Sequence, residues 1–312
     1  MINKKLITFV STLLVLIFHL WISITTNSIE NFLRYVCVIG VDLFFFVSAY
    51  SIAGNKEINY KLFIKNRFIN IYLKFLLFTI VYAIYASKNI ELFFKTIFFI
   101  NLFDRGGGSF LWFIPAIMIV YLLLPLYKKI DEKNSKLCLI STIIVYLGLV
   151  IGVSYFTVYN SIFIFVNRIP IILIGYYVSK YKLFSKINNN ILYFIISLLL
   201  IIVGLYISYN YCYNTLRLDW FNDINYILSI PLELGIIMIL SKLSNNKITD
   251  LIGSASLEVY AIQMIFGFKF ANSVYSLTNN ALISDIIVII SIIIDGIILR
   301  KIFDLVLKKL GN

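Results

Sequence analysis

The stretch LLVLIFHLWIS, residues 13–23, holds the single histidine of the 312-residue chain and lies within a long apolar run. At about 1.5 Å of helical rise per residue, the segment 6–25 is long enough to cross a hydrocarbon core of about 30 Å. The run follows Lys4 and Lys5 but lacks a small-x-small cleavage site, so we expect a retained helix rather than a signal peptide. The sequence therefore predicts a membrane helix that carries an imidazole, His19, in its outer half.

The rest of the chain repeats this apolar pattern. Hydrophobic residues make up 61% of the sequence and the mean hydropathy is +0.94, whereas soluble domains are about half apolar. We predict an all-α, multi-pass protein of the cell membrane that forms one transmembrane domain over residues 1–312. Its predicted spans, about ten in number, are 6–25, 35–54, 68–86, 110–127, 137–156, 160–179, 191–210, 222–241, 251–271 and 282–300.

Basic residues give the chain a net charge of +12, but they lie in short clusters between apolar runs. This distribution argues against nucleic-acid binding, which uses a basic stripe or domain. Most of the 27 Lys and Arg residues fall on the side of the N-terminus, so the positive-inside rule predicts that both termini are cytoplasmic. On the opposite side, ELFFKTIFFINLF at 91–103 predicts a short interfacial or re-entrant helix, or else an apolar loop.

Three cysteines, Cys37, Cys138 and Cys212, are scattered singly along the chain. Their spacing is not that of a metal site, and a lone cysteine in an apolar segment usually serves as a small hydrophobic residue. We therefore expect no bound metal.

Four polar side chains are predicted to share one layer near the outer surface. His19 and Asp42 are equidistant from a turn near residue 30, and Arg168 and Gln263 lie at similar distances from the outer ends of their spans. Helical rise places all of them ~10 Å below the outer surface. A charge at the bilayer centre costs about 2.5–3.5 kcal/mol on insertion scales, so each is a functional candidate. The structural alternatives are an interhelical hydrogen bond for His19 and an ion pair between Asp42 and Arg168.

Two further acids, Glu233 and Glu258, lie deeper in their predicted spans. Glu233 follows Pro231, where a broken helix would expose backbone groups. Both acids are candidates for a substrate path, with a purely structural role as the alternative.

Five motifs give the chain a resemblance to a known family. They are VLIFHLW at 15–21, GVDLFFFVSAYSI at 40–52, LWFIPAIMIVYLLLP at 111–125, RIPIILIGYY at 168–177 and GSASLEVYAIQ at 253–263. In this order they resemble the acyltransferase-3 family of integral-membrane acyltransferases, from the first predicted span to the ninth. Where that family has further histidines, this chain has Phe110 and Gln263, so His19 is its one possible imidazole base.

The resemblance implies transfer of an acyl group, usually acetyl, from cytoplasmic acyl-coenzyme A to a hydroxyl of an extracytoplasmic, cell-envelope carbohydrate, either a polysaccharide or a lipid-linked sugar. Imidazole has an unperturbed pKa of about 6.5 and suits proton transfer from a hydroxyl. Asp42 is expected to hold one ring nitrogen of His19, and Arg168 or Gln263 to stabilise the oxyanion. A covalent acyl-histidine intermediate is equally allowed.

The donor and acceptor sites are predicted on separate groups of residues. Cations near the inner surface are expected to bind the phosphates of the coenzyme, with plain positive-inside topology as the alternative. Aromatic residues are expected to line a carbohydrate groove, with an interfacial aromatic belt as the alternative. The cations are Lys61, Lys65, Arg67 and Lys74, and the aromatic residues are Trp112, Phe113 and Tyr121.

Two other functions fit the same pattern of spans and polar residues. A transporter or flippase of a lipid-linked sugar would also have about ten spans, a polar layer and a helix broken at Pro231. A non-catalytic subunit of an envelope-polymer assembly complex is the third hypothesis. Formation of an ester from labelled acetyl-coenzyme A would separate the enzyme from the transporter.

Overall fold

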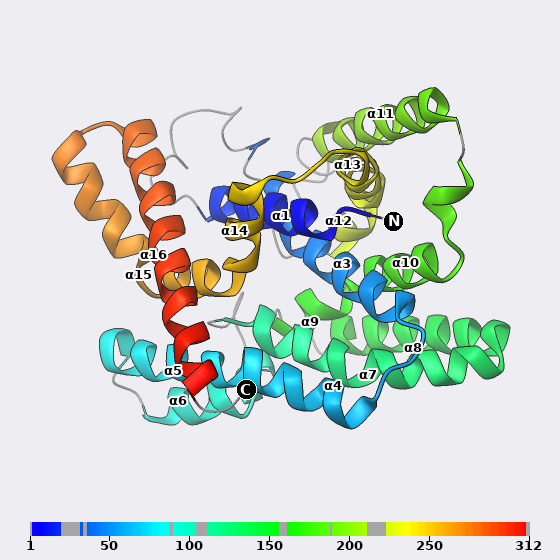
Figure 1. The fold of residues 1–312 in the computed structure, drawn as a ribbon, viewed down its shortest axis with the longest axis horizontal. Helices are drawn as coiled ribbons and strands as arrows, with labels where there is room; N and C mark the ends of the chain where they lie inside the picture. Colours follow the sequence, from blue (N-terminus) through cyan, green and yellow to red (C-terminus); the bar gives the residue numbers. More distant parts are fainter. Residues whose placement is uncertain are drawn as a thin grey trace. The chain divides into compact units, whose positions relative to one another are not determined.

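The computed structural model describes residues 2–19, 32–33, 36–87, 90–103, 111–155, 161–187, 189–210 and 223–309, and their regular structure is helical (Figure 1). A 3-10 turn at Cys37–Ile39 leads into α3, and a π-helical turn at Phe68–Tyr72 joins α4 to α5. The all-α prediction is thus confirmed. The α-helices are α1 (Lys4–Phe18), α3 (Gly40–Gly54), α4 (Tyr60–Arg67), α5 (Leu73–Tyr82), α6 (Ile90–Ile97), α7 (Phe113–Lys133), α8 (Ser135–Tyr155), α9 (Ser161–Val166), α10 (Ile169–Lys180), α11 (Asn190–Ile207), α12 (Asp223–Leu228), α13 (Ile230–Lys242), α14 (Lys247–Ser254), α15 (Ser256–Thr278) and α16 (Ala281–Lys309).

Within the described residues, seven helical segments are long and apolar enough to cross a membrane, or eight if the bent pair α14 and α15 counts as one span. This number is lower than the predicted ten for two reasons. The described part of α1 has only 15 residues, and the predicted span 222–241 is divided into α12 and α13 at Ser229. The multi-pass membrane architecture is confirmed, whereas the orientation of the termini stays a prediction.

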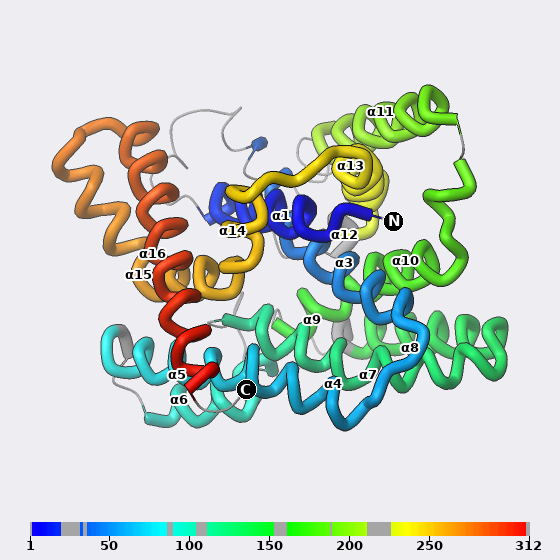
Figure 2. Tube along the Cα trace, in the orientation of Figure 1, coloured from blue at the N-terminus to red at the C-terminus, as the bar shows by residue number. Residues whose placement is uncertain are grey.

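The helix breaks follow from proline chemistry. Proline lacks a backbone N–H and disfavours the helical conformation of the residue before it. Pro231 lies just after the break at Ser229, and Pro170 lies just after the break between α9 and α10. The bend of 57° between α14 and α15 falls at Ala255 instead. Figure 2 traces the chain through this bend.

The segment predicted to lie outside contains a short helix, the first of the two alternatives. Residues Ile90–Ile97 form α6, in which Lys95 and Glu91 make an ion pair of 2.9 Å. The glycines at 106–108 that follow lie outside the described residues.

The chain divides into two compact units. Unit one comprises Met1–Phe44, Asn190–Trp220 and Pro231–Asn312, and unit two comprises Phe45–Asn189 and Phe221–Ile230. This division does not test the prediction that residues 1–312 form a single domain.

Unit one is built around the packing of α1, α15 and α16. Helices α15 and α16 are joined by a short turn and run side by side (orange and red in Figure 1). Gly296 permits their close approach, because an added Cβ would lie 2.4 Å from Cγ2 of Val259. Leu16 of α1 joins the same buried cluster, with Ala255, Val259, Ile262, Ala271, Val274, Val288 and Ile292.

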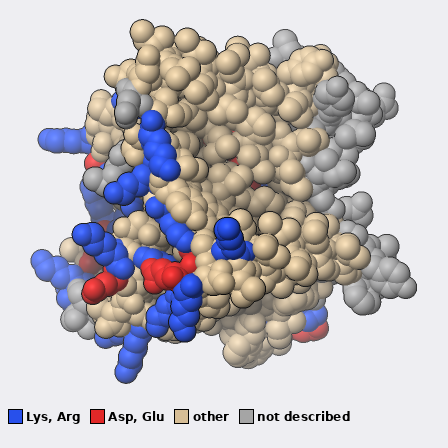
Figure 3. All heavy atoms as spheres, turned by 90° about the vertical axis from the view of Figure 1, so that its right-hand side faces the viewer, with Lys and Arg blue, Asp and Glu red and all other residues tan. Residues whose placement is uncertain are grey.

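In unit two, the neighbouring helices α7 and α8 differ strongly in how much of their surface other helices cover. In α7, half of the residues are buried, whereas in Ser135–Gly152 of α8 only 6% are buried. An apolar helix with so little protein cover must face lipid. Figure 3 shows broad areas of surface without charged side chains, as a membrane protein requires.

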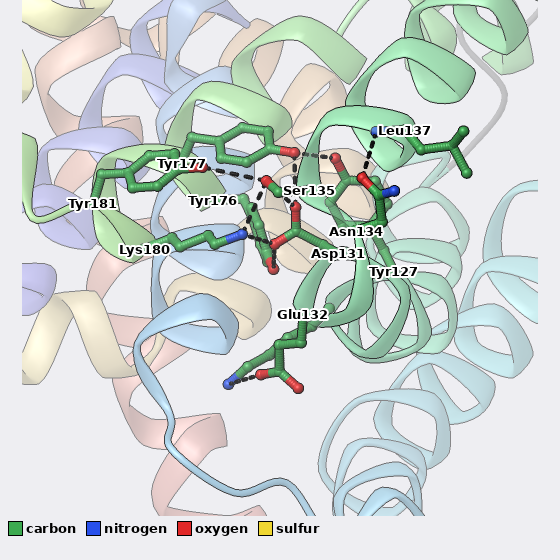
Figure 4. A network of polar contacts seen from close by, with 11 residues as sticks. Tyr127, Asp131, Glu132, Asn134, Ser135, Leu137, Tyr176, Tyr177, Lys180 and Tyr181 are labelled. Carbon is green, nitrogen blue, oxygen red and sulfur yellow. Dashed lines mark hydrogen bonds and ion pairs between the residues drawn. The ribbon is translucent and has the colours of Figure 1, made fainter.

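A buried carboxylate fixes one end of unit two (Figure 4). Asp131, in the last turn of α7, accepts hydrogen bonds from Tyr176 Oη at 2.7 Å, Tyr177 Oη at 3.1 Å and Ser135 Oγ at 2.9 Å. It also pairs with Lys180 Nζ, and the Asp131 side chain is 0% exposed. These contacts tie the junction of α7 and α8 to the end of α10.

Replacing Asp131 with Ala should destabilise the protein strongly, since it removes the acceptor of the Tyr176 hydroxyl and the carboxylate that pairs with Lys180. Loss of one partner of a buried pair typically costs about 3–5 kcal/mol. The thermal denaturation midpoint of the purified protein in detergent would measure this. Glu132→Ala is the matched control, because Glu132 is largely exposed and lies 3.8 Å from Lys128. Equal midpoints for the two variants would contradict the assignment.

The predicted orientation is tested by thiol labelling. Leu62 lies on α4 in the segment expected to be cytoplasmic and is 54% exposed. In a background without native cysteines, Leu62→Cys should react with a membrane-impermeant reagent only after the cytoplasmic side is opened. Labelling from the outside of intact cells would reverse the orientation.

Candidate active site

His19 lies directly at the end of α1, as its C-cap residue. The last carbonyls of a helix lack intrahelical partners and must be satisfied by other donors. Val15 O accepts from the His19 backbone N–H at 3.2 Å and from His19 Nδ1 at 2.8 Å. The ring therefore serves as a cap for the helix that carries it.

The contact with Val15 defines the tautomer of a neutral His19 ring. A carbonyl oxygen only accepts, so Nδ1 carries the proton and Nε2 presents a lone pair. A backbone carbonyl thus orients Nδ1, the role that the sequence analysis gave to Asp42. This arrangement suits Nε2 for accepting a proton from a bound group.

Gln263 of α15 supports the same helix end. Its Nε2 lies 3.4 Å from Val15 O and 3.3 Å from Leu16 O. Because both partners are acceptors, the amide must direct its N–H groups toward them, and Oε1 has no hydrogen-bond partner among the described residues. In this arrangement the atom of Gln263 that is left over is an acceptor, and the role of Gln263 as an oxyanion donor stays a prediction.

His19 and Gln263 line one pocket in unit one, together with a residue that the sequence analysis did not select, Asp285 of α16. Gln263 is 4% exposed and Asp285 is 3% exposed. The remaining wall is apolar and includes part of the buried cluster described above. It consists of Leu16, Gly267, Ala271, Val288, Ile289 and Ile292.

Asp42 lies in the first turn of α3 and is 1% exposed. The nearby Gly40 packs against α1, where its added Cβ would lie 2.9 Å from Leu14 Cβ and from Ser11 O. A hairpin with its turn near residue 30 would instead bring Gly40 opposite residue 20. The contact is therefore shifted toward the start of α1 by roughly six residues, or ~9 Å of rise. The pairing of Asp42 with His19 stays a prediction.

Arg168 occupies the break between α9 and α10 in unit two. Its backbone N–H bonds to Phe165 O, which leaves Ile164 O to accept from Arg168 Nη1 at 2.7 Å. The guanidinium lies 4.0 Å from the ring centroid of Tyr226 and 5.1 Å from that of Trp112. This buried arginine caps a helix end and stacks on aromatic rings.

The predicted donor-binding cations differ in their surroundings. Lys61 and Lys65 are exposed on α4, while the Arg67 guanidinium lies 4.4 Å from the ring centroid of Tyr121. Lys74 is only 3% exposed, in the interior of unit two. Lys61 and Lys65 are thus the accessible members of the group.

The predicted acceptor aromatics all take part in packing within unit two. Trp112 contacts Arg168 as described, and Phe113 packs edge to face on Phe45 with ring centroids 5.3 Å apart. Tyr121 is 8% exposed, and its hydroxyl lies 3.1 Å from Ser48 Oγ. Their role in carbohydrate binding stays a prediction.

Glu233 and Glu258 are completely buried, each in the first turn of a helix that follows a break, α13 and α15 respectively. A negative charge near a helix N-terminus is stabilised by the free N–H groups there. This position favours the structural alternative, and the predicted role of both acids in a substrate path stays a prediction.

The sequence pattern does not indicate that Asp285 and Asp131 are buried, and the reason differs between the two residues. Asp131 lies among charged residues in KKIDEK, 128–133, which read as a solvated loop. Asp285 lies near the start of the predicted span 282–300, where a charge at the membrane surface needs no explanation. Only the packing of α16 on α15 shows that Asp285 is buried.

Comparison with known proteins agrees with the fold and the sequence motifs. A model of the acyltransferase-3 family, described as an acyltransferase domain, matches residues 6–300. Nothing matches this chain among curated proteins or among solved structures. Because the family model covers most of the chain, this protein belongs to the acyltransferase-3 family of membrane acyltransferases. No group of His, Cys, Asp or Glu suited to holding a metal occurs among the described residues.

Proposed function

We propose that this protein is an O-acyltransferase that moves an acyl group, acetyl in the simplest case, from cytoplasmic acyl-coenzyme A to a hydroxyl of an extracytoplasmic cell-envelope carbohydrate. The observation that carries this proposal is the fixed imidazole of His19. Its Nδ1 is bonded to Val15 O, and it lines a small, mainly apolar pocket together with Gln263 and Asp285, in a chain of this family.

The reaction needs one base that later acts as an acid. His19 Nε2 takes the proton as the acceptor oxygen attacks the thioester carbonyl, and the C–O bond forms. When the tetrahedral intermediate collapses, the C–S bond breaks and the thiolate leaves. The imidazolium returns the proton to the thiolate, giving the ester and free coenzyme A.

The phosphates of the donor call for exposed cations on the cytoplasmic side. Lys61 and Lys65 are exposed on α4, which is predicted to lie on that side, and Arg67 follows Lys65 by two residues. Charge-assisted hydrogen bonds from such groups to phosphate are about twice as strong as neutral ones.

His19→Ala should nearly abolish acyl transfer, because loss of a general base typically lowers the rate ~10²–10⁴-fold. Transfer is measured with labelled acetyl-coenzyme A and a cell-envelope glycan fraction, using purified protein in vesicles. Ser11→Ala, on the same helix, should retain activity, since Ser11 Oγ bonds only to Ile7 O within α1. A fully active His19→Ala protein would exclude this mechanism.

Asp42→Asn in the same assay separates its two proposed roles. If Asp42 stabilises the His19 imidazolium, the Asp42→Asn/His19→Ala double variant should be little worse than His19→Ala, since groups that act together are not additive. If Asp42 has only a structural role, Asp42→Asn should lower the denaturation midpoint of the protein and have little effect on turnover.

Replacing Lys65 and Arg67 together with Gln should raise the KM for acyl-coenzyme A on the order of a hundredfold or more, because two charged hydrogen bonds are lost and each typically costs about 1.5–3 kcal/mol. The KM for the glycan should not change. The matched control is Lys129→Gln with Lys133→Gln, two exposed cations at the end of α7. An unchanged donor KM in the first variant would remove α4 from the donor site.

The alternative function is a transporter or flippase of a lipid-linked sugar. The assay of the wild-type protein distinguishes it from an acyltransferase. A transporter would move the labelled sugar across the vesicle membrane without forming an ester. His19 would then have no chemical role.

A further inference from the structure

The guanidinium of Arg67, at the end of α4, lies against two aromatic rings of unit two. Its central carbon is 4.4 Å from the ring centroid of Tyr121 and 5.1 Å from that of Phe63. The two ring centroids are 6.0 Å apart and the ring planes meet at 78°, so the rings form a corner around the cation. A guanidinium within about 6 Å of a ring centroid is attracted to the ring face. Both rings therefore restrain where the guanidinium can lie.

The positions of these side chains follow from the sequence and from the packing of α4 on α7. Phe63 and Arg67 are four residues apart on α4, a spacing that places both side chains on one face of the helix. Tyr121 belongs to α7, and the neighbouring Leu122 O accepts a hydrogen bond from Tyr60 Oη of α4 at 3.2 Å. This bond holds the two helices together beside the cation.

The Tyr121 ring is itself held in place. It is 8% exposed, and its hydroxyl lies 3.1 Å from Ser48 Oγ of α3. Phe63 packs on it edge to face. The ring of Tyr121 is thus fixed by contacts with two other helices, and it offers Arg67 a rigid surface.

The rings leave the N–H groups of Arg67 available. Among the described residues, the Arg67 guanidinium contacts aromatic rings and no carboxylate or other hydrogen-bond acceptor. Two other described arginines do bond to the protein, since Arg168 donates to Ile164 O and Arg300 to Asp304. A guanidinium carries five N–H donors in a planar fork that matches the oxygens of a phosphate. Arg67 therefore presents this fork to a ligand.

We infer that Tyr121 and Phe63 are positioning residues of the donor site, which hold the fork of Arg67 in place for a phosphate group of acyl-coenzyme A. This inference rests on the proposed function. A group that is already ordered binds more tightly, because less side-chain freedom is lost on binding. The exposed Lys61 and Lys65 on the same helix add positive charge nearby. Tyr121 thus serves the donor and not the acceptor carbohydrate.

The test begins with Tyr121→Leu in the vesicle assay with labelled acetyl-coenzyme A and the envelope glycan fraction. The donor KM should rise several-fold, up to about tenfold, because the freed Arg67 side chain must now be ordered when the phosphate binds. The glycan KM and kcat should stay within about twofold of the wild-type values. Tyr121→Phe keeps the ring but loses the contact with Ser48, so it should restore the donor KM.

Phe63→Leu is a second variant, which protects the test against misfolding of Tyr121→Leu. Phe63 is only partly buried, and its replacement should also raise the donor KM and spare the glycan KM. Phe68→Leu is the matched control on the following turn. The Phe68 ring is 45% exposed and stacks on Tyr72 with centroids 4.8 Å apart, so both KM values should be unchanged.

A double-variant cycle tests whether Tyr121 acts through Arg67. In an Arg67→Gln background, Tyr121→Leu should cause no further rise of the donor KM, because effects that depend on one shared group do not add. A further rise of the same size would overturn the inference. A rise of the glycan KM in place of the donor KM would also overturn it, and would place Tyr121 at the acceptor. An unchanged donor KM in Tyr121→Leu, the result expected if Arg67 binds the phosphate of a lipid headgroup, would overturn it too.

Equilibrium binding of labelled coenzyme A to the full chain in detergent distinguishes this inference from the proposed function. Wild-type protein that binds coenzyme A, with binding weakened by Tyr121→Leu, but forms no ester would support the inference and contradict the acyltransferase reaction. Ester formation with coenzyme A binding unaffected by Tyr121→Leu would support the reaction and contradict the inference. Wild-type protein that binds no coenzyme A would contradict both.

Discussion

The candidate site depends on the need of the last carbonyls of α1 for hydrogen-bond donors, since the helix ends before it can supply all of them. In an apolar surrounding each such group costs several kcal/mol unless a donor reaches it. Three donors meet this need at Val15 O and Leu16 O: the His19 backbone, the His19 ring and the Gln263 amide. The requirement for backbone hydrogen bonds thus fixes the ring and places the proton of a neutral ring on Nδ1, and both His19 and Gln263 line the pocket.

The same constraint recurs where other helices break. At the junction of α9 and α10, the Arg168 guanidinium bonds to Ile164 O, which the turn before Pro170 leaves free. At the starts of α13 and α15, Glu233 and Glu258 lie beside free N–H groups. Arg168, Glu233 and Glu258 thus each have a structural role at the end of a helix, and their predicted functional roles stay predictions.

Hydropathy predicted the helical membrane fold well, because the length of an apolar run and the thickness of a bilayer are directly linked. The motifs around His19, Asp42 and Arg168 identified the family because they occur in the order that the family has. Register was harder. Equal distance from a turn assumes two straight helices in symmetric contact, but Gly40 packs near Ser11 and Leu14. Asp285 could not be selected, because its burial depends on the packing of α16 against α15.

The small protein cover of α8 has a consequence for how this sequence changes over time. Since 6% of the residues in Ser135–Gly152 are buried, most positions there must only remain apolar, and one aliphatic side chain can replace another with little effect on packing. Residues of α8 should therefore drift rapidly among related proteins, while Asp131 and Ser135 at its junction with α7 should stay fixed. The same tolerance makes the exposed face of α8 a suitable place for a fluorophore or spin label that leaves the catalytic machinery undisturbed.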